Sequence, residues 1–265
     1  MKGILNREKC LSHLRDEELI KTMTQLLNRW ERAFYRKIRE ITDFYDPYTR
    51  EVGEGILSGL SGMSFLAFGG FPEAERKRLA IFPEGDKVGT KDFNLSFLQA
   101  EGNFKFQKVN HRDFLGSLLG LGIERAKIGD IIVEDYGCQV VLDQDIASYV
   151  IMNWDKVNCV SVKVREISPE DVRVPQAKKK EIKSTVASPR LDAVSGTGFG
   201  LSRSKTLLDI KSGKVQVNWK TIIDPAYQIK AGDKISYRGK GRIIVDGISG
   251  PTQKGRYFIY ISRYL

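Results

Sequence analysis

Residues 93–166 carry strand and helix patterns in a fixed order, which limits the possible folds more than any other feature of the chain. Short apolar runs predict four strands, at Phe93–Gln99, Asp130–Asp135, Gln139–Leu142 and Cys159–Glu166. Longer periodic runs predict two helices, at Asn110–Gly120 and Asp145–Asp155. A tight turn is expected at Tyr136-Gly137-Cys138, between the second and third strands. The segment therefore reads strand, helix, strand, strand, helix, strand.

This order is the split β-α-β arrangement of ferredoxin-like and RRM-like domains. A fold of this kind hosts many functions, so it does not assign one. RRM domains commonly stack RNA bases on aromatic side chains of their sheet. The third expected strand, Gln139–Leu142, carries no aromatic residue, so we do not expect base stacking on it.

The residues before this segment predict a smaller α/β domain. A long amphipathic helix is expected after Asp16, a good N-cap, because apolar residues recur there at spacings of three and four. Asp46-Pro47 interrupts the pattern, and a short second helix is expected to follow. The remaining expected elements are a strand at Met63–Phe68, a helical turn at Phe71–Arg78 and a strand at Leu79–Phe82.

We therefore predict an α+β protein with four segments. These are an N-terminal α/β domain (1–84), an RRM-like domain (85–167), a basic linker (168–187) and a C-terminal domain (188–265). The linker prediction rests on composition, because 168–187 has few large apolar residues and contains Lys178-Lys179-Lys180.

Positive charge is concentrated at one end of the chain. The 265 residues include 43 Lys and Arg against 33 Asp and Glu, a net charge of +10. From Arg173 to Leu265 there are 19 basic and 6 acidic residues, whereas the rest of the chain is slightly acidic. Such confinement is expected when a single module meets a polyanion. Surplus lysines can also serve solubility alone, so the motifs have to decide.

A helix start in the basic segment has the features of an anion site. Ser202 is expected to cap a helix whose first turn carries Arg203 and Lys205. The helix dipole disfavours cations at this end by about 0.3–1 kcal/mol, so a structural role explains them poorly. Free N–H groups, the dipole and two cations would together bind one phosphate.

The residues that follow predict a small sheet with basic turns. Lys214–Asn218 alternates as a half-buried strand with Lys214, Gln216 and Asn218 on the wet face, and Lys234–Tyr237 predicts a second strand. In the run Arg238-Gly239-Lys240-Gly241-Arg242, glycines between cations allow a close approach to phosphate. Further strands are expected at Ile243–Asp246 and Tyr257–Ser262.

These blocks resemble the S-four domain, or alpha-L RNA-binding motif. The resemblance rests on Arg190-Leu191-Asp192, Ser202-Arg203-Ser204-Lys205, Gly213–Asn218 and Lys230–Ile235, in the right order and spacing. It implies two helices and a small sheet that form one RNA-facing surface. The RNA-facing residues it implies are Arg190, Ser202, Arg203, Lys205, Lys211, Lys214, Asn218 and Lys220. To these we add Arg238, Lys240 and Arg242 from the glycine-rich run.

Nearly the whole chain resembles the YlmH family, including its cyanobacterial and plastid relatives, the photosystem II S-four domain proteins. The resemblance rests on Gly69–Arg76, His111–Gly116, Lys127–Ile131 and Arg238–Arg242. It implies an N-terminal domain, a central RRM-like domain and a C-terminal RNA binder that works near the large ribosomal subunit. We therefore expect a non-catalytic, ribosome-associated protein that binds structured rRNA or tRNA, as a monomer, in the cytoplasm or plastid stroma.

Two other functions compete with this interpretation. Arg190-Leu191-Asp192 followed by Ser195-Gly196 is similar to the catalytic segment of pseudouridine synthases, an RNA-modifying activity, but too few residues follow it for a synthase domain. Alternatively, the basic end could dock on anionic lipid, which needs only charge and leaves the ordered blocks unexplained. The glycine-rich run Gly196–Gly200 predicts a turn between two helices.

No cofactor or metal is expected. The 3 cysteines are odd in number and lie far apart in the sequence, without the spacing of a metal site, and the chain has only 2 histidines. No apolar run approaches the roughly 18 residues that a membrane span needs, so none is expected.

Overall fold

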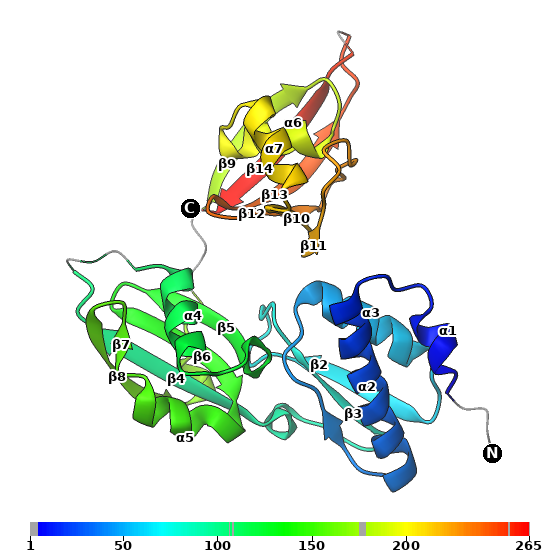
Figure 1. Cartoon of the computed structure of the whole chain (residues 1–265), viewed down its shortest axis with the longest axis vertical. Helices are drawn as coiled ribbons and strands as arrows, with labels where there is room; N and C mark the ends of the chain where they lie inside the picture. The colour runs from blue at the N-terminus through cyan, green and yellow to red at the C-terminus, as the bar shows by residue number, and fades with distance from the viewer. Residues whose placement is uncertain (1–4, 106, 108, 175–178, 254, 265) are drawn as a thin grey trace. The chain divides into compact units, whose positions relative to one another are not determined.

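A computed structural model describes residues 5–105, 107, 109–174, 179–253 and 255–264. The chain forms two compact units, Met1–Pro175 and Gln176–Leu265, here called the N-terminal and C-terminal units. Both combine helices with antiparallel sheets, which confirms the predicted α+β class (Figure 1).

The N-terminal unit begins with a three-stranded sheet covered by helices. The strands are β1 (Glu40–Ile41), β2 (Met63–Phe68) and β3 (Arg78–Pro83), in the order β1-β3-β2. The helices are α1 (Arg7–Leu11), α2 (Glu17–Arg36) and α3 (Pro47–Ser58). The Asp16 and Asp46 carboxylates accept backbone N–H groups at the starts of α2 and α3, as their side chains lead one to expect. Trp30, Leu26 and Leu79 are buried between the helices and the sheet.

The central part of this unit has the expected strand and helix order. Its strands are β4 (Leu95–Gly102), β5 (Ile128–Glu134), β6 (Gly137–Asp143), β7 (Lys156–Val157) and β8 (Val160–Ile167), in the sheet order β5-β6-β4-β8-β7. Its helices are α4 (His111–Gly120) and α5 (Gln144–Asn153), with short 3-10 turns η1 (Thr90–Phe93), η2 (Arg125–Lys127) and η3 (Pro169–Asp171). Phe93 belongs to η1 rather than to the strand, because Asn94 adopts a left-handed conformation (φ 50°) that breaks the extended run.

The segment Phe71–Arg78 is not helical, contrary to the prediction: Pro72 and Glu73 form a turn, and Arg78 begins β3. Its backbone instead bonds to a distant part of the unit. The N–H groups of Glu75 and Arg76 donate to the Asp130 carboxylate at 2.6 and 3.1 Å. The Arg76 guanidinium donates to the carbonyls of Phe44 and Ile128. Two segments that suggested the YlmH resemblance, Gly69–Arg76 and Lys127–Ile131, thus meet at the junction of the two sheets.

The face of the central sheet opposite α4 and α5 is covered. Alternate residues of β4 and β6 point to opposite faces, so Phe97 and Val141 lie on this second face, where Phe71 and Phe44 pack. The backbone crosses closely at Gly70, where an added Cβ would lie 2.8 Å from the Phe97 ring and φ is +104°. The face that RRM domains commonly offer to RNA is here occupied by the chain itself.

A buried arginine strengthens this junction. The Arg78 guanidinium, 5% exposed, donates to the carbonyls of Thr42 and Asn94 and pairs with the Asp143 carboxylate at 3.2 Å. Lys127 contacts the same carboxylate at 2.9 Å. Burial alone would raise the pKa of Asp143, but these two cations hold it below its usual range.

The C-terminal unit is one six-stranded antiparallel sheet with two helices on one face (Figure 1). Its strands are β9 (Lys179–Val186), β10 (Val215–Val217), β11 (Lys220–Thr221), β12 (Lys234–Tyr237), β13 (Gly241–Ser249) and β14 (Tyr257–Tyr264), in the order β11-β10-β12-β13-β14-β9. The helices are α6 (Leu191–Phe199) and α7 (Arg203–Lys211). The core between helices and sheet includes Val194, Ile210, Ile235 and Ile259.

Two predictions for this unit are wrong. The expected linker 168–187 contains η3 and all of β9, whose residues pair along their whole length with β14. β9 lies at the sheet edge, so only alternate residues such as Ile182 and Val186 are apolar, and its composition resembles that of a linker. Residues 196–199 continue α6, and of the predicted turn residues Gly200 alone (φ +67°) ends the helix. Gly198 instead allows close packing on the sheet, since a Cβ there would lie 2.5 Å from Ile243.

Candidate RNA-binding surface

A buried carboxylate organises the junction between α6 and α7. Asp192 lies in the first turn of α6, where the helix dipole favours an anion, and its side chain is fully buried. Its Oδ1 accepts the Ala193 N–H at 2.9 Å. A buried carboxylate requires charged or hydrogen-bonding partners, and two arginines supply the rest.

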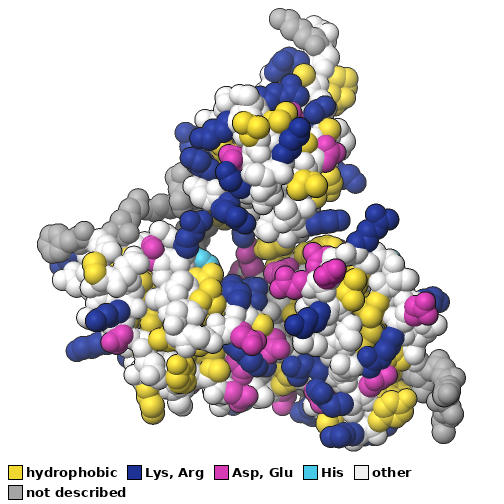
Figure 2. Space-filling view, viewed as in Figure 1, with side chains coloured by type: hydrophobic (Ala, Val, Ile, Leu, Met, Phe, Trp, Pro, Cys, Tyr) yellow, Lys and Arg dark blue, Asp and Glu magenta, His cyan; other side chains and the backbone are white. Residues whose placement is uncertain are grey.

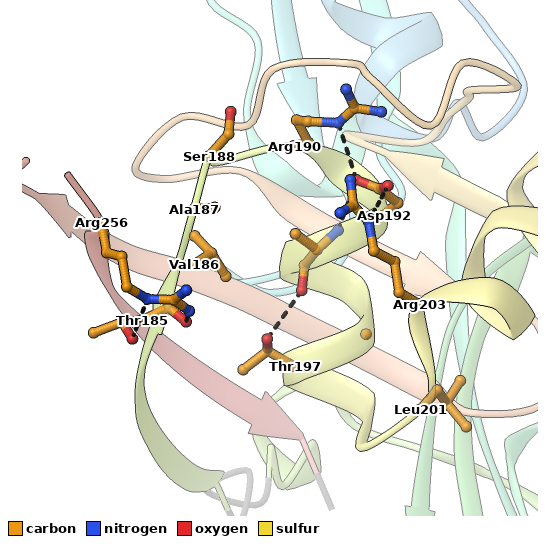
Figure 3. Close-up of a pocket in the computed structure, with 12 residues that line it drawn as sticks. Thr185, Val186, Ala187, Ser188, Arg190, Asp192, Thr197, Leu201, Arg203 and Arg256 are labelled. Carbon is orange, nitrogen blue, oxygen red and sulfur yellow. Dashed lines mark hydrogen bonds and ion pairs between the residues drawn. The ribbon is translucent and has the colours of Figure 1, made fainter. Parts of the chain in front are cut away.

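Arg190 and Arg203 converge on this carboxylate (Figure 3). Arg190, the residue before α6, donates through Nε to Oδ1 at 3.2 Å, and Arg203, the first residue of α7, donates through Nε to Oδ2 at 2.8 Å. Their side chains remain 36% and 63% exposed. Within the described part of the chain, these Nε contacts are the only side-chain hydrogen bonds of the two guanidiniums. Both therefore keep Nη groups available for an anionic ligand.

The two arginines line a hollow of about 320 Å³ next to the start of α6 (Figure 3). Arg256 lies on the opposite wall, where Thr185 holds it: Nε donates to the threonine hydroxyl at 3.1 Å and Nη2 to the carbonyl at 2.8 Å. Asp192 is the acid in this wall and is already paired. The hollow thus has three guanidiniums and one carboxylate, a surplus of positive charge that fits a phosphate.

The start of α7 differs in detail from the expected phosphate site. The Ser202 hydroxyl accepts the Lys205 N–H, as a capping residue should, and contacts the Ser204 hydroxyl. The Lys205 side chain is exposed, whereas the Arg203 side chain pairs with Asp192. Arg203 is therefore positioned by α6, which explains a cation at a helix start without invoking a ligand.

A second basic group lies at the other end of α7. The Lys214 ammonium pairs with the Asp209 carboxylate at 2.6 Å, which holds the pKa of Asp209 below its usual range. The Arg238 N–H donates to the Lys214 carbonyl, so the β12–β13 turn adjoins the start of β10. Lys211 ends α7, with its side chain exposed. Asp209 also accepts the Tyr237 hydroxyl at 2.5 Å; burial and this carboxylate raise the pKa of Tyr237.

A third group surrounds the β10–β11 turn. Asn218 and Trp219 adopt positive φ angles of 49° and 65°, as a two-residue hairpin turn requires. The Asn218 amide is engaged with Asp233 and the backbone N–H of Lys234, so it shapes the turn. Arg242 lies 5.3 Å from the centre of the Trp219 ring. The side chains of Lys220 and Lys240 are exposed, on β11 and in the β12–β13 turn.

The sequence-predicted residues thus fall into three groups of one unit, and two important residues were missed. Asp192 was not proposed as a site residue, although the Arg-Leu-Asp block contains it. Arg256 lies outside all four blocks, and only its pairing with β9 brings it to the hollow. Figure 2 shows Lys and Arg side chains across the visible, helix-bearing face of the C-terminal unit, with few Asp and Glu among them.

Two further kinds of feature are absent from the part of the chain that the structure describes. No set of three His, Cys, Asp or Glu side chains in them is arranged to hold a metal ion. None of the helices described is long and apolar enough to cross a membrane.

Comparisons with known proteins match all three parts of the chain. Family models match at residues 18–85 (YlmH, N-terminal), 89–171 (putative RNA-binding domain in YlmH) and 190–235 (S4, or S-four, domain). The ribosome-associated protein quality control protein P2 of Bacillus subtilis is 36% identical over 238 residues, covering 88% of this chain and 91% of that protein. This chain belongs to the YlmH family. The predicted S-four resemblance is confirmed by the same comparison.

A solved YlmH structure agrees with the fold. The cell division protein ylmH from Streptococcus pneumoniae matches with a TM-score of 0.51 and 21% identity, covering 64% of this chain and all of that one. At this identity the likeness concerns the fold alone. The S4 match spans 190–235 and includes Arg190, Asp192 and Arg203, whereas β9, β14 and Arg256 lie outside it.

Proposed function

We propose that this YlmH-family protein binds structured RNA of the rRNA or tRNA kind on the large ribosomal subunit, without catalysing a reaction on it. The process served is translation or its quality control, in the cytoplasm or plastid stroma. The Bacillus relative, named as a ribosome-associated quality control protein, supports the process, and the matched RNA-binding domains support the ligand.

The observation that carries the proposal is the pair of arginines held on buried Asp192. Arginine forks bind phosphate oxygens in pairs, and a guanidinium fixed at Nε loses little freedom when its Nη groups bind. The hollow beside them carries Arg256 as a third cation. Such a site reads phosphate positions and therefore the shape of a folded RNA rather than its sequence.

Features of the hollow support binding over catalysis. Its acid, Asp192, is fully buried and bonded to two arginines and a backbone N–H, so it is poorly placed to attack a base or ribose. The chemistry of the lining is that of an anion receptor.

The test is binding of the full chain to an RNA hairpin and to purified large ribosomal subunits. The variant Arg190→Ala/Arg203→Ala should lose about 10- to 100-fold in hairpin affinity, or about 1.4–2.8 kcal/mol in total, because each of the two part-exposed contacts contributes less than the roughly 1.5–3 kcal/mol of a hydrogen bond to a charged group. The matched control is Lys21→Ala/Lys87→Ala, which removes two exposed cations of the N-terminal unit that lie outside the matched RNA-binding domain at 89–171. Equal losses in both variants would show that net charge alone drives binding and would refute the proposal.

A second experiment tests whether the protein modifies RNA. Ribosomal RNA incubated with the protein is digested and its nucleosides are analysed by mass spectrometry. We expect no modified nucleoside that depends on the protein. The appearance of pseudouridine or another modification, lost in Asp192→Asn, would instead establish an RNA-modifying enzyme.

A further inference from the structure

The sheet of the C-terminal unit has a second face, opposite α6 and α7. Because strand residues alternate, Ile259 and Ile261 of β14 point into the core and are buried, whereas Phe258 and Tyr260 point to the other face. The pairing places Lys183 of β9 directly opposite Tyr260 on that face. We call it the open face, and it lies largely outside the residues matched by the S4 domain.

Aromatic rings on the open face are exposed and close to cations. Phe258 and Tyr260 are each 37% exposed, large values for aromatic residues of a strand. The Lys183 ammonium lies 5.7 and 5.3 Å from the two ring centres. At the end of β14, Lys179 lies 5.2 Å from the centre of the Tyr264 ring.

The same arrangement recurs at the other side of this face. Ser236 pairs with Arg242 across β12 and β13, next to the buried pair of Ile235 and Ile243, so Arg242 lies on the open face. Lys234 and Arg242 both approach the Trp219 ring, at 5.0 and 5.3 Å from its centre. Three strand spacings, about 14 Å, separate β10 from β14. The open face therefore carries two aromatic groups, each with basic side chains beside it.

We propose that the open face binds unpaired RNA, with bases stacked on Phe258 and Tyr260 and the backbone phosphates neutralised by Lys183 and its neighbours. Lys179, Lys183, Lys234 and Arg242 are the cations of this face, against the acids Glu181, opposite Ser262, and Asp246, in the β13 bulge beside Tyr260. Exposed rings interleaved with cations are what binding of single strands requires. The site lies on the other face of the sheet from the arginine hollow and adjoins it at Thr185, which pairs with Phe258 and also lines the hollow. It therefore extends the proposed function to a second RNA element.

Base stacking on the rings is stronger than the cation–ring contact of Lys183, so an RNA base should displace the lysine ammonium from the rings. Stacking a base on an aromatic ring strengthens binding by about 5- to 150-fold per base, whereas an exposed cation on a ring contributes about 5-fold or less. Lys183 has a flexible stem and an exposed side chain. A base can therefore displace the ammonium from the ring, and the lysine can contact the adjoining phosphate.

The test compares two RNAs, a ten-nucleotide oligouridine and a blunt-ended RNA hairpin, with the full chain. The variant Phe258→Leu/Tyr260→Leu removes both rings and keeps apolar strand residues. It should bind oligouridine at least tenfold more weakly and the hairpin within twofold of the unchanged protein. Lys183→Glu, which leaves the rings in place, should also weaken oligouridine binding. The matched control is Tyr35→Leu, at a tyrosine 70% exposed in α2 and outside the matched RNA-binding domains, and should change neither affinity.

Ultraviolet crosslinking gives a readout independent of stability. Oligouridine should crosslink to the tryptic peptide 257–263, which contains both rings. Unchanged oligouridine affinity in the ring variant, an equal loss for both RNAs, or crosslinks confined to other peptides would overturn the proposal. Failure of the unchanged protein to bind the hairpin would refute the proposed function instead, and the oligouridine results would still decide this one.

Discussion

Asp192 offers the sharpest test of how the C-terminal unit binds RNA. Substitution of this residue should change RNA affinity in one direction if net charge determines the affinity, and in the other direction if the positions of the two arginines determine it. Asp192→Asn removes a negative charge from the wall of the arginine hollow and so raises the net charge by one. If RNA affinity follows charge alone, the variant binds more tightly. If affinity follows the positions of Arg190 and Arg203, it binds more weakly, because an amide cannot accept from both guanidiniums as the carboxylate does.

The expected loss can be worked out from the contacts. A hydrogen bond to a charged group contributes about 1.5–3 kcal/mol, but exposed ion pairs measure only about 0–1 kcal/mol. Arg203 is 63% and Arg190 36% exposed, so water replaces part of each bond. We expect the C-terminal unit to lose about 1–3 kcal/mol of stability. Freeing two arginines adds about 1–3 kcal/mol of ordering cost to RNA binding, roughly a 5- to 150-fold rise in Kd.

The assay is fluorescence anisotropy with a labelled RNA hairpin at fixed salt, below the Tm of every variant. Asp246→Asn is the matched control, since it adds the same charge at an exposed residue in the β13 bulge. We expect this control to bind as tightly as the unchanged protein or slightly more tightly. An Asp192→Asn variant that remains folded and binds as tightly as Asp246→Asn would refute the positioning argument.

Three further predictions concern salt, packing and pH. If the protein neutralises about five RNA phosphates, the slope of log affinity against log salt should be about −3.5 to −4.5, and Arg203→Ala should reduce its size by about one; a slope near zero in a salt titration would contradict this. Arg78→Met should destabilise the N-terminal unit by about 3–5 kcal/mol, because the Asp143 carboxylate loses a buried partner, and calorimetry should show the C-terminal unit unaffected. Because the pKa of Asp143 is lower in the folded chain than in the unfolded chain, its contribution is present at neutral pH and is lost as the pH falls through the lowered value. The difference in Tm between Asp143→Asn and the unchanged protein should therefore shrink in acid, and a constant difference would contradict the assignment.

Local signals in the sequence predicted most of the regular elements. Asp16, Asn110 and Ser202 cap helices that begin at the next residue, because short polar side chains accept N–H groups that have no partner inside the helix. Strands with a clear apolar core face, such as Met63–Phe68 and Lys234–Tyr237, were predicted at the residues where they lie.

The features that the sequence did not predict depend on contacts between residues far apart in the chain. β9 pairs with β14 far along the chain, and an edge strand with a polar face has no local pattern that distinguishes it from a linker. The non-helical course of Gly69–Arg76 depends on Asp130, which no local pattern reveals. For the same reason Arg256 could not be assigned to the hollow. The whole set of RNA contacts stays a prediction, as do the domain boundaries other than those of the linker.

The covered face of the central sheet has a consequence for how this family can evolve. Separate family models describe residues 18–85 and 89–171, yet Phe71 and Phe44 from the first complete the core of the second. A recombination event that joined either part to a foreign neighbour would leave Phe97 and Val141 uncovered and the Asp143 carboxylate without Arg78. The two parts are therefore expected to be inherited together.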